Sequence, residues 1–97
     1  MKTNDIKKGM VVELNNGWFG IMADNMRGNT RMVDVDGMYR EIGSVYSHDI
    51  IKAWNTKLKV GSDIQKQLTY EQLYVDGIDI EHNKKQLELK SFVASNY

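Results

Sequence analysis

The chain contains no cysteine and no proline among its 97 residues. Without cysteine it can form neither a disulfide nor a thiolate metal site, which is typical of proteins from a reducing compartment. Neither sign of charge predominates, because 13 Lys and Arg balance 13 Asp and Glu, and residues 1–55 and 56–97 are each balanced as well. Proteins that bind nucleic acid through its phosphates are usually basic, so this balance lowers that expectation without removing it.

Long apolar runs are also missing. No stretch approaches 18 apolar residues, and Met1–Asp5 leads into charged residues rather than into an apolar segment. We therefore expect no membrane span and no signal peptide, and a cytoplasmic protein. The hydrophobic content of 41% and the charged content of 27% are ordinary for one small globular domain.

The first half has short apolar segments separated by turn residues at intervals of about ten. This pattern predicts strands at 10–14, 18–23, 30–35, 38–42 and 50–54. Asn16-Gly17 and Asp36-Gly37 predict tight two-residue hairpin turns, of type I′ at Asn16-Gly17. Gly20 inside a strand predicts a bulge or bend, and residues 44–49 predict a short turn or a single 3₁₀ turn. The prediction is a mainly β fold, with a five-stranded antiparallel barrel over residues 1–55; an open five-stranded sheet packed on a helix is the alternative.

The second predicted hairpin also sets which side chains point inward. A two-residue turn at Asp36-Gly37 pairs Val35 with Met38 and Val33 with Arg40. We then expect Met38 and Ile42 inside the barrel and Arg40 near its rim.

Residues 56–97 form a C-terminal extension that we expect to pack on the barrel, giving one structural domain overall. Ser62-Asp63 predicts the start of a short helix that runs to about Leu73, and Asp76-Gly77 breaks it. Residues 78–81 and 86–90 alternate with period two on either side of 82–85, which favours a β-hairpin over a helix from 81 to 93. Because isolated hairpins are marginally stable, self-association into a homo-oligomer is a further expectation.

Three segments carry a resemblance to a known family: GMVVELNNGWFGIMADN, RMVDVDGMYREIG and SHDIIKAW. Together they resemble small SH3-like β-barrel proteins that bacteriophages and mobile elements commonly encode, over about residues 6–54. The resemblance implies an SH3-like barrel and carries over no functional residues. Ala53-Trp54 and the long C-terminal extension depart from the family pattern.

We find no catalytic motif, and we predict no enzyme activity, no cofactor and no metal. His48 and His82 are the only histidines, and a metal site usually needs three or four converging ligands. Asp34–Gly37 has only half of a calcium loop and is better explained as a hairpin turn. Ser47 and Asp49 are expected to cap the turn before the last strand.

Five of the six methionines lie within residues 10–38, and methionine serves both irregular cores and adaptable binding surfaces. We expect Met10 and Met38 in the core, Met22 and Met32 pointing outward, and Met26 in a loop. With neighbouring aromatic and arginine side chains they predict a contact surface of the kind enriched in protein interfaces: Trp18, Met22, Met26, Arg27, Arg31, Met32, Tyr39 and Arg40. Equally, the extension could cover such outward residues, Trp18 and Trp54 above all.

These features favour a non-enzymatic module that binds and occludes a protein partner. If the family resemblance holds, it would be a phage accessory or anti-defence inhibitor that acts on a host or defence-system protein in the host cytoplasm. The alternative is a nucleic-acid-binding small barrel that uses Arg27, Arg31, Arg40 and Lys52 on phosphates, with Trp18 or Tyr39 stacking on bases. A third hypothesis is sequestration of a small nucleotide-like ligand between protomers.

Overall fold

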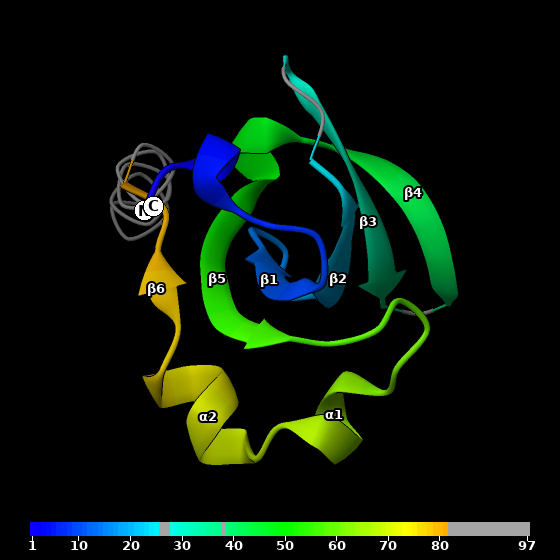
Figure 1. The fold of residues 1–97 in the computed structure, drawn as a ribbon, viewed down its shortest axis with the longest axis vertical. Helices are drawn as coiled ribbons and strands as arrows, with labels where there is room; N and C mark the ends of the chain where they lie inside the picture. The colour runs from blue at the N-terminus through cyan, green and yellow to red at the C-terminus, as the bar shows by residue number, and fades with distance from the viewer. Residues whose placement is uncertain (26–27, 38, 82–97) are drawn as a thin grey trace, which may run out of the picture.

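A computed structural model describes residues 1–25, 28–37 and 39–81 of the chain. It is mainly β, as predicted, with one antiparallel sheet whose strands follow the order β4-β3-β2-β1-β5-β6. Two short α-helices and two 3₁₀ turns complete it (Figure 1). The strands are β1 (Met10–Leu14), β2 (Phe19–Asp24), β3 (Thr30–Asp36), β4 (Arg40–Tyr46), β5 (Ile50–Lys57) and β6 (Ile78–Asp79).

All five predicted strands form, and β6 adds a sixth at the edge beside β5. The sheet curls strongly around its inner face (Figure 1). Within the described ranges, β4 and β6 are the outer strands and no ladder joins them, so the sheet is not a closed barrel. The predicted turn at 44–49 is shorter than expected, because β4 continues to Tyr46 and only η2 (Ser47–Asp49) is 3₁₀. Asp49 caps it, accepting the backbone N–H of Tyr46 at 3.1 Å.

The first hairpin turn lies at the predicted place but is not of type I′. Only Gly17 has a positive φ, of 88°, whereas type I′ needs it at both central residues. The Gly17 N–H donates to the Leu14 carbonyl at 2.9 Å, and the Leu14 N–H donates to the Trp18 carbonyl at 2.8 Å. This is the hydrogen bonding of a longer loop in which a left-handed glycine closes the turn.

The second hairpin has a different register from the predicted one. Asp36 pairs with Arg40, and Val33 pairs with Gly43 rather than with Arg40. The turn therefore spans residues 37–39, and the three-residue shift turns every β4 side chain to the opposite face. Ile42 was expected inside and is instead 55% exposed. Met38 lies outside the described residues.

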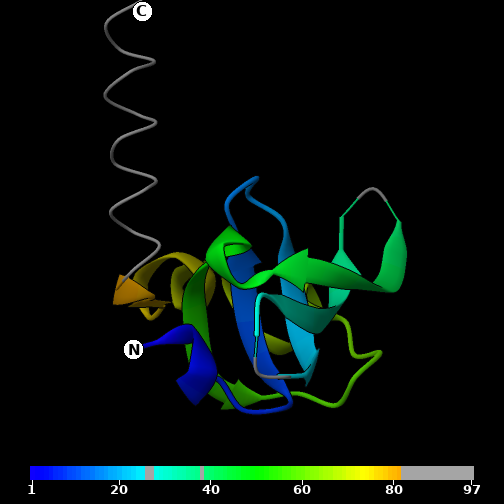
Figure 2. The same cartoon turned by 90° about the horizontal axis from the view of Figure 1, so that it is seen from above.

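Gly37 is required by its surroundings rather than by the turn type. A Cβ at this position would lie 2.3 Å from Cε3 of Trp18. Both hairpin turns project from the same end of the sheet (Figure 2), which brings Trp18 over the second turn. Trp18 is nevertheless 43% exposed, so the described part of the extension does not bury it.

The inner face of the curled sheet holds the first core. Its side chains come from β1, β2, β3 and β5, with contributions from the N-terminal segment and from Ile80. The buried members are Ile6, Met10, Val12, Leu14, Met22, Val33, Val35, Ile50, Ala53 and Ile80. Met10 is in the core as predicted.

The outer face is covered in part by a second core under the extension. Val11, Ile21 and Trp54 of the sheet pack against Ile64, Leu68 and Leu73. The helices lie outside the curl and next to β5 (Figure 1). Trp54 is buried as expected, and its Nε1–H donates to the Gln72 carbonyl at 2.6 Å.

The predicted helix over 62–73 forms as two shorter ones, α1 (Ile64–Gln67) and α2 (Tyr70–Val75). The Asp63 side chain caps α1, accepting from the backbone N–H groups of Gln65 and Lys66. Thr69 and Gln72 then start α2 with a reciprocal capping box.

The predicted break after α2 is present, and β6 follows it. β6 pairs with β5, through Ala53 with Ile78 and Lys52 with Asp79. The expected second strand at 86–90 lies outside the described residues. Among residues that the structure describes, no helix is long and apolar enough to cross a membrane.

Candidate functional site

The structure does not gather the predicted contact surface on one face. Met22 is fully buried in the inner core, and Arg31 is only 1% exposed, so both predictions of outward side chains are wrong. Met32 is half-buried, and its Sδ accepts from the Ser44 hydroxyl at 3.2 Å. Trp18 and Tyr39 are exposed near the hairpin turns, Tyr39 at 75%. Met26 and Arg27 lie outside the described residues.

Met22 was misassigned because β2 is covered on both faces. Ile21 packs in the outer core and Met22 in the inner core, where it pairs with Val33. Alternation assigns a side chain to one face or the other, but it cannot say that a helix covers the second face.

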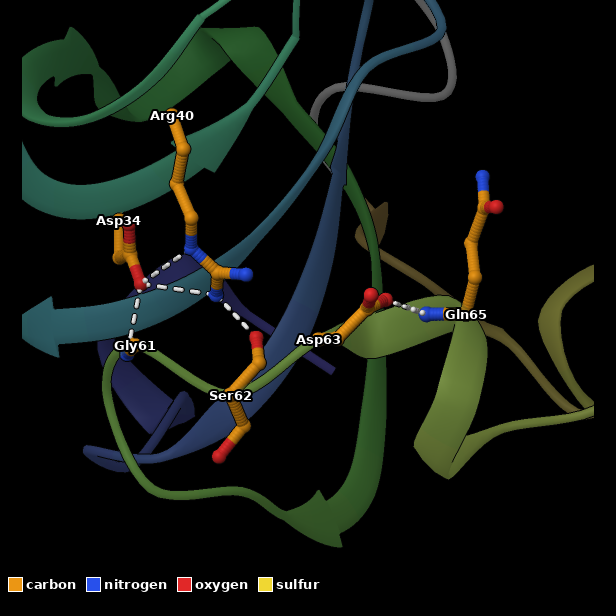
Figure 3. A network of polar contacts seen from close by, with 6 residues as sticks. All are labelled: Asp34, Arg40, Gly61, Ser62, Asp63 and Gln65. Atoms are coloured by element: carbon orange, nitrogen blue, oxygen red, sulfur yellow. Dashed lines mark hydrogen bonds and ion pairs between the residues drawn. The ribbon is translucent and has the colours of Figure 1, made fainter.

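Arg40 does lie at the rim, where it forms an ion pair. Its Nε and Nη2 donate to Oδ2 of Asp34 at 3.3 and 3.0 Å. The same oxygen accepts the backbone N–H of Gly61 at 2.8 Å, and Nη2 also donates to the Ser62 carbonyl (Figure 3). Asp34 is buried, so its charge depends on these donors. The hydrogen-bonding groups of Arg40 therefore attach the Gly61-Ser62 segment, which follows β5, to Asp34 on β3.

Next to this network lies a groove on the outer face, with a volume of about 660 Å³. The stretch from Lys57 to Val60 forms its wall. Within this stretch the Leu58 N–H donates to the Gly9 carbonyl at 2.6 Å, so the wall is attached to the residue before β1. Apolar side chains form the floor and basic side chains the rim. The lining residues that define this lysine groove are Ile42, Leu58 and Val60 with Lys8, Lys57 and Lys59.

The three lysines of the groove are exposed, and the described part of the chain places no ion-pair partner beside them. None of them forms an ion pair with any residue in the described ranges, and no acidic residue lines the groove. The net charge of the chain is zero, yet this surface carries three positive charges. A local basic patch therefore exists where the balanced composition gave no sign of one.

The groove was missed in the sequence because its parts are distant along the chain. One signal was present: Lys57 and Lys59 alternate with Leu58 and Val60, which places charge and apolar surface side by side. Ile42 was expected inside the sheet, so no floor could be foreseen.

A second surface consists of a series of aromatic rings in tilted and edge-to-face contact, which we call the aromatic ladder. From the buried Trp54 it runs outward to Phe19, then to Tyr74 and Tyr70, with ring centroids 5.6, 5.9 and 4.6 Å apart. The two tyrosines are more than half exposed. A hollow of about 370 Å³ lies between Phe19, Gln65 and α2.

The arginines proposed for phosphate contact do not form an accessible set. Arg31 is buried and Arg40 is paired with Asp34. Lys52 faces Glu13 across β1 and β5. Within the described part of the chain, no three His, Asp or Glu side chains gather as a metal site would require.

Comparison with protein-family models, with curated proteins and with solved structures finds no match for this chain. Its function is therefore argued from the geometry of these surfaces.

Proposed function

We propose that this chain is a non-enzymatic protein-binding module on an open SH3-like barrel, and that it holds an acidic, partly apolar segment of its partner in the lysine groove. The curled sheet and the 3₁₀ turn before β5 support the barrel. The observation that carries the binding role is the groove itself, with an apolar floor and three unpaired lysines around it.

The chemistry of the partner follows from this lining. An apolar floor binds aliphatic or aromatic side chains by excluding water, while rim lysines attract carboxylates and speed association. A purely apolar peptide would leave the lysines without a counter-charge. A purely acidic peptide would leave the apolar floor of the groove exposed to water.

The aromatic ladder gives further support for a protein partner. Tyrosine is enriched in protein interfaces because it buries much area at small entropic cost and keeps a polar end. Tyr74 is held against Phe19, and Tyr70 against Tyr74, before any partner arrives. We propose them as additional partner contacts.

The resemblance to phage-encoded SH3-like proteins adds a proposal about the partner's origin. An acidic surface on a host or defence-system protein would be occluded by this module, which would make the chain an accessory or anti-defence inhibitor. The proposal of an accessory or anti-defence role rests on this resemblance.

The test is fluorescence anisotropy with a labelled peptide of mixed glutamate and leucine, at low and physiological salt. Two rim lysines are removed in the Lys57→Gln/Lys59→Gln variant, and Lys52→Gln/Lys66→Gln removes the same charge elsewhere. We expect the first variant to weaken binding roughly three- to tenfold and the control to change it little. Equal effects of the two variants would overturn the role of the groove.

Nucleic-acid binding is the second candidate, because the same three lysines could contact phosphates. A labelled poly-dT oligonucleotide distinguishes it: phosphate-driven binding falls steeply with salt, and the oligonucleotide would then displace the peptide. The second measurement is capture of proteins from nuclease-treated lysate by the native chain, the groove variant and the control variant. A stoichiometric protein captured by the native chain and by the control, but not by the groove variant, supports the protein partner.

A further inference from the structure

Arg31 is a buried arginine near the start of β3 that lies next to the N-terminal segment. Its guanidinium donates to the carbonyls of Gly28 and Thr30 at 2.8 and 2.9 Å and to Oδ1 of Asn4 at 2.5 Å. These contacts use three of the five N–H groups of the side chain. Nε is buried and has no hydrogen-bond partner among the residues that the structure describes.

The charge of Arg31 has no carboxylate opposite it. No ion pair joins it to an acidic residue in the described ranges. An arginine side chain keeps its positive charge at all physiological pH values, and a buried charge without a counter-ion is costly. Carbonyl and amide oxygens solvate the guanidinium partly but do not neutralise it.

Arg31 also lines a cavity of about 560 Å³, which lies apart from the lysine groove. Lys2 provides a second positive charge there, and Thr3 provides a hydroxyl group. The one carboxylate in the lining, Glu81, already faces the N-terminal ammonium at 3.6 Å. The charge that remains is positive.

We propose that this cavity is a phosphate site, occupied by inorganic phosphate or by the terminal phosphate of a small phosphomonoester. A phosphate oxygen would accept from the guanidinium, and the second negative charge would lie near Lys2. The hydroxyl group of Thr3 suits a tetrahedral anion, which presents more acceptor oxygens than a carboxylate. This site is separate from the lysine groove and does not depend on the proposed function.

The test is isothermal titration of the full chain with inorganic phosphate at constant ionic strength, with acetate and chloride as comparison anions. Lys2→Gln removes the second charge at an exposed position, and Lys66→Gln on α1 is its matched control. Because rim charges act through water, we expect Lys2→Gln to weaken phosphate binding roughly three- to tenfold and Lys66→Gln to leave it unchanged. No saturable heat with phosphate, or equal effects of the two variants, would overturn the proposal.

Arg31→Lys keeps the charge but loses the planar fork, and we expect it to weaken binding more than tenfold. Should this variant fail to fold, the NMR signal of Arg31 Nε–H in the unaltered chain replaces it. Phosphate should shift that signal and acetate should not, and an unchanged signal at saturation would contradict the site. Adenosine monophosphate distinguishes the two sources: tighter binding than phosphate identifies a phosphomonoester, and equal or weaker binding identifies the free ion.

Discussion

Gly20 and Gly43 both lie on the inner face of the sheet, but they differ in the space above them. A Cβ at Gly20 would lie 2.4 Å from Cγ1 of Val33 and 2.9 Å from the Asp34 carbonyl oxygen, whereas at Gly43 it would meet nothing within 4 Å. We expect Gly20→Ala to lower the free energy of unfolding by about 2–3 kcal/mol, because backbone must move. Gly43→Ala should be neutral or stabilise by up to about 1 kcal/mol. Urea unfolding of both variants measures this, and equal effects would contradict the packing around Gly20.

Glu13 gives a pH-dependent prediction. Burial raises the pKa of its carboxyl above the usual 4.5, and the opposing effect of Lys52 is smaller. Since the folded state then holds the proton more tightly than the unfolded state, the charged carboxylate lowers stability once the pH rises through the folded pKa. Glu13→Gln should therefore be more stable than the native chain near pH 7, by less than about 1 kcal/mol.

The difference in stability between the native chain and the Glu13→Gln variant should shrink as the pH falls through the raised folded pKa, and should vanish below 4.5, where Glu13 is protonated in both states. Thermal unfolding of the two proteins across this range measures it. If Glu13→Gln instead lowers stability at pH 7, the contact with Lys52 outweighs burial.

At the scale of elements, α2 packs on the outer core through one buried side chain. Leu73 is its only buried residue, and it packs with Trp54 and Ile21. Leu73→Ala should lower the free energy of unfolding by about 2–4 kcal/mol, because a short exposed helix cannot collapse fully onto the cavity. Val75→Ala, on the exposed side of the same helix, should change it by less than about 0.5 kcal/mol. Similar losses in both variants would show that helix propensity, rather than packing, is what α2 contributes.

The elements also show what could be predicted from sequence. Period-two patterns and turn residues located all five strands of the first half, and Asp63 located the start of α1. The register of the second hairpin was not predictable, because Gly37 is needed for the close approach of Trp18 and not for the two-residue turn that Asp36-Gly37 suggested. That error alone hid Ile42 and, with it, the floor of the lysine groove. Arg31 was missed for a different reason: it shares a strand face with the buried Val33 and Val35, but a charged side chain is usually exposed.

At the scale of the whole molecule, the curled sheet and the extension cannot be separated, because neighbouring residues divide between the two cores. On β1, Val11 faces the outer core and Val12 the inner one. Ile21 and Met22 divide in the same way on β2, as Ala53 and Trp54 do on β5. Unpacking the extension would expose Trp54 and the apolar side chains beside it on strands that also form the inner core. We therefore expect residues 1–81 to unfold in one cooperative step.

A single tryptophan substitution tests this cooperativity. Trp18 is partly exposed and Trp54 is buried under the extension, so Trp18→Phe leaves Trp54 as the only tryptophan and a reporter of the outer core. The urea midpoint from Trp54 emission should coincide with the midpoint from far-UV circular dichroism, which follows the sheet as a whole. Matching denaturant slopes from the two probes would show that both follow the same change in exposed surface. An earlier transition in the emission would mean that the extension detaches first, and the wall of the lysine groove would then form only when the extension is docked.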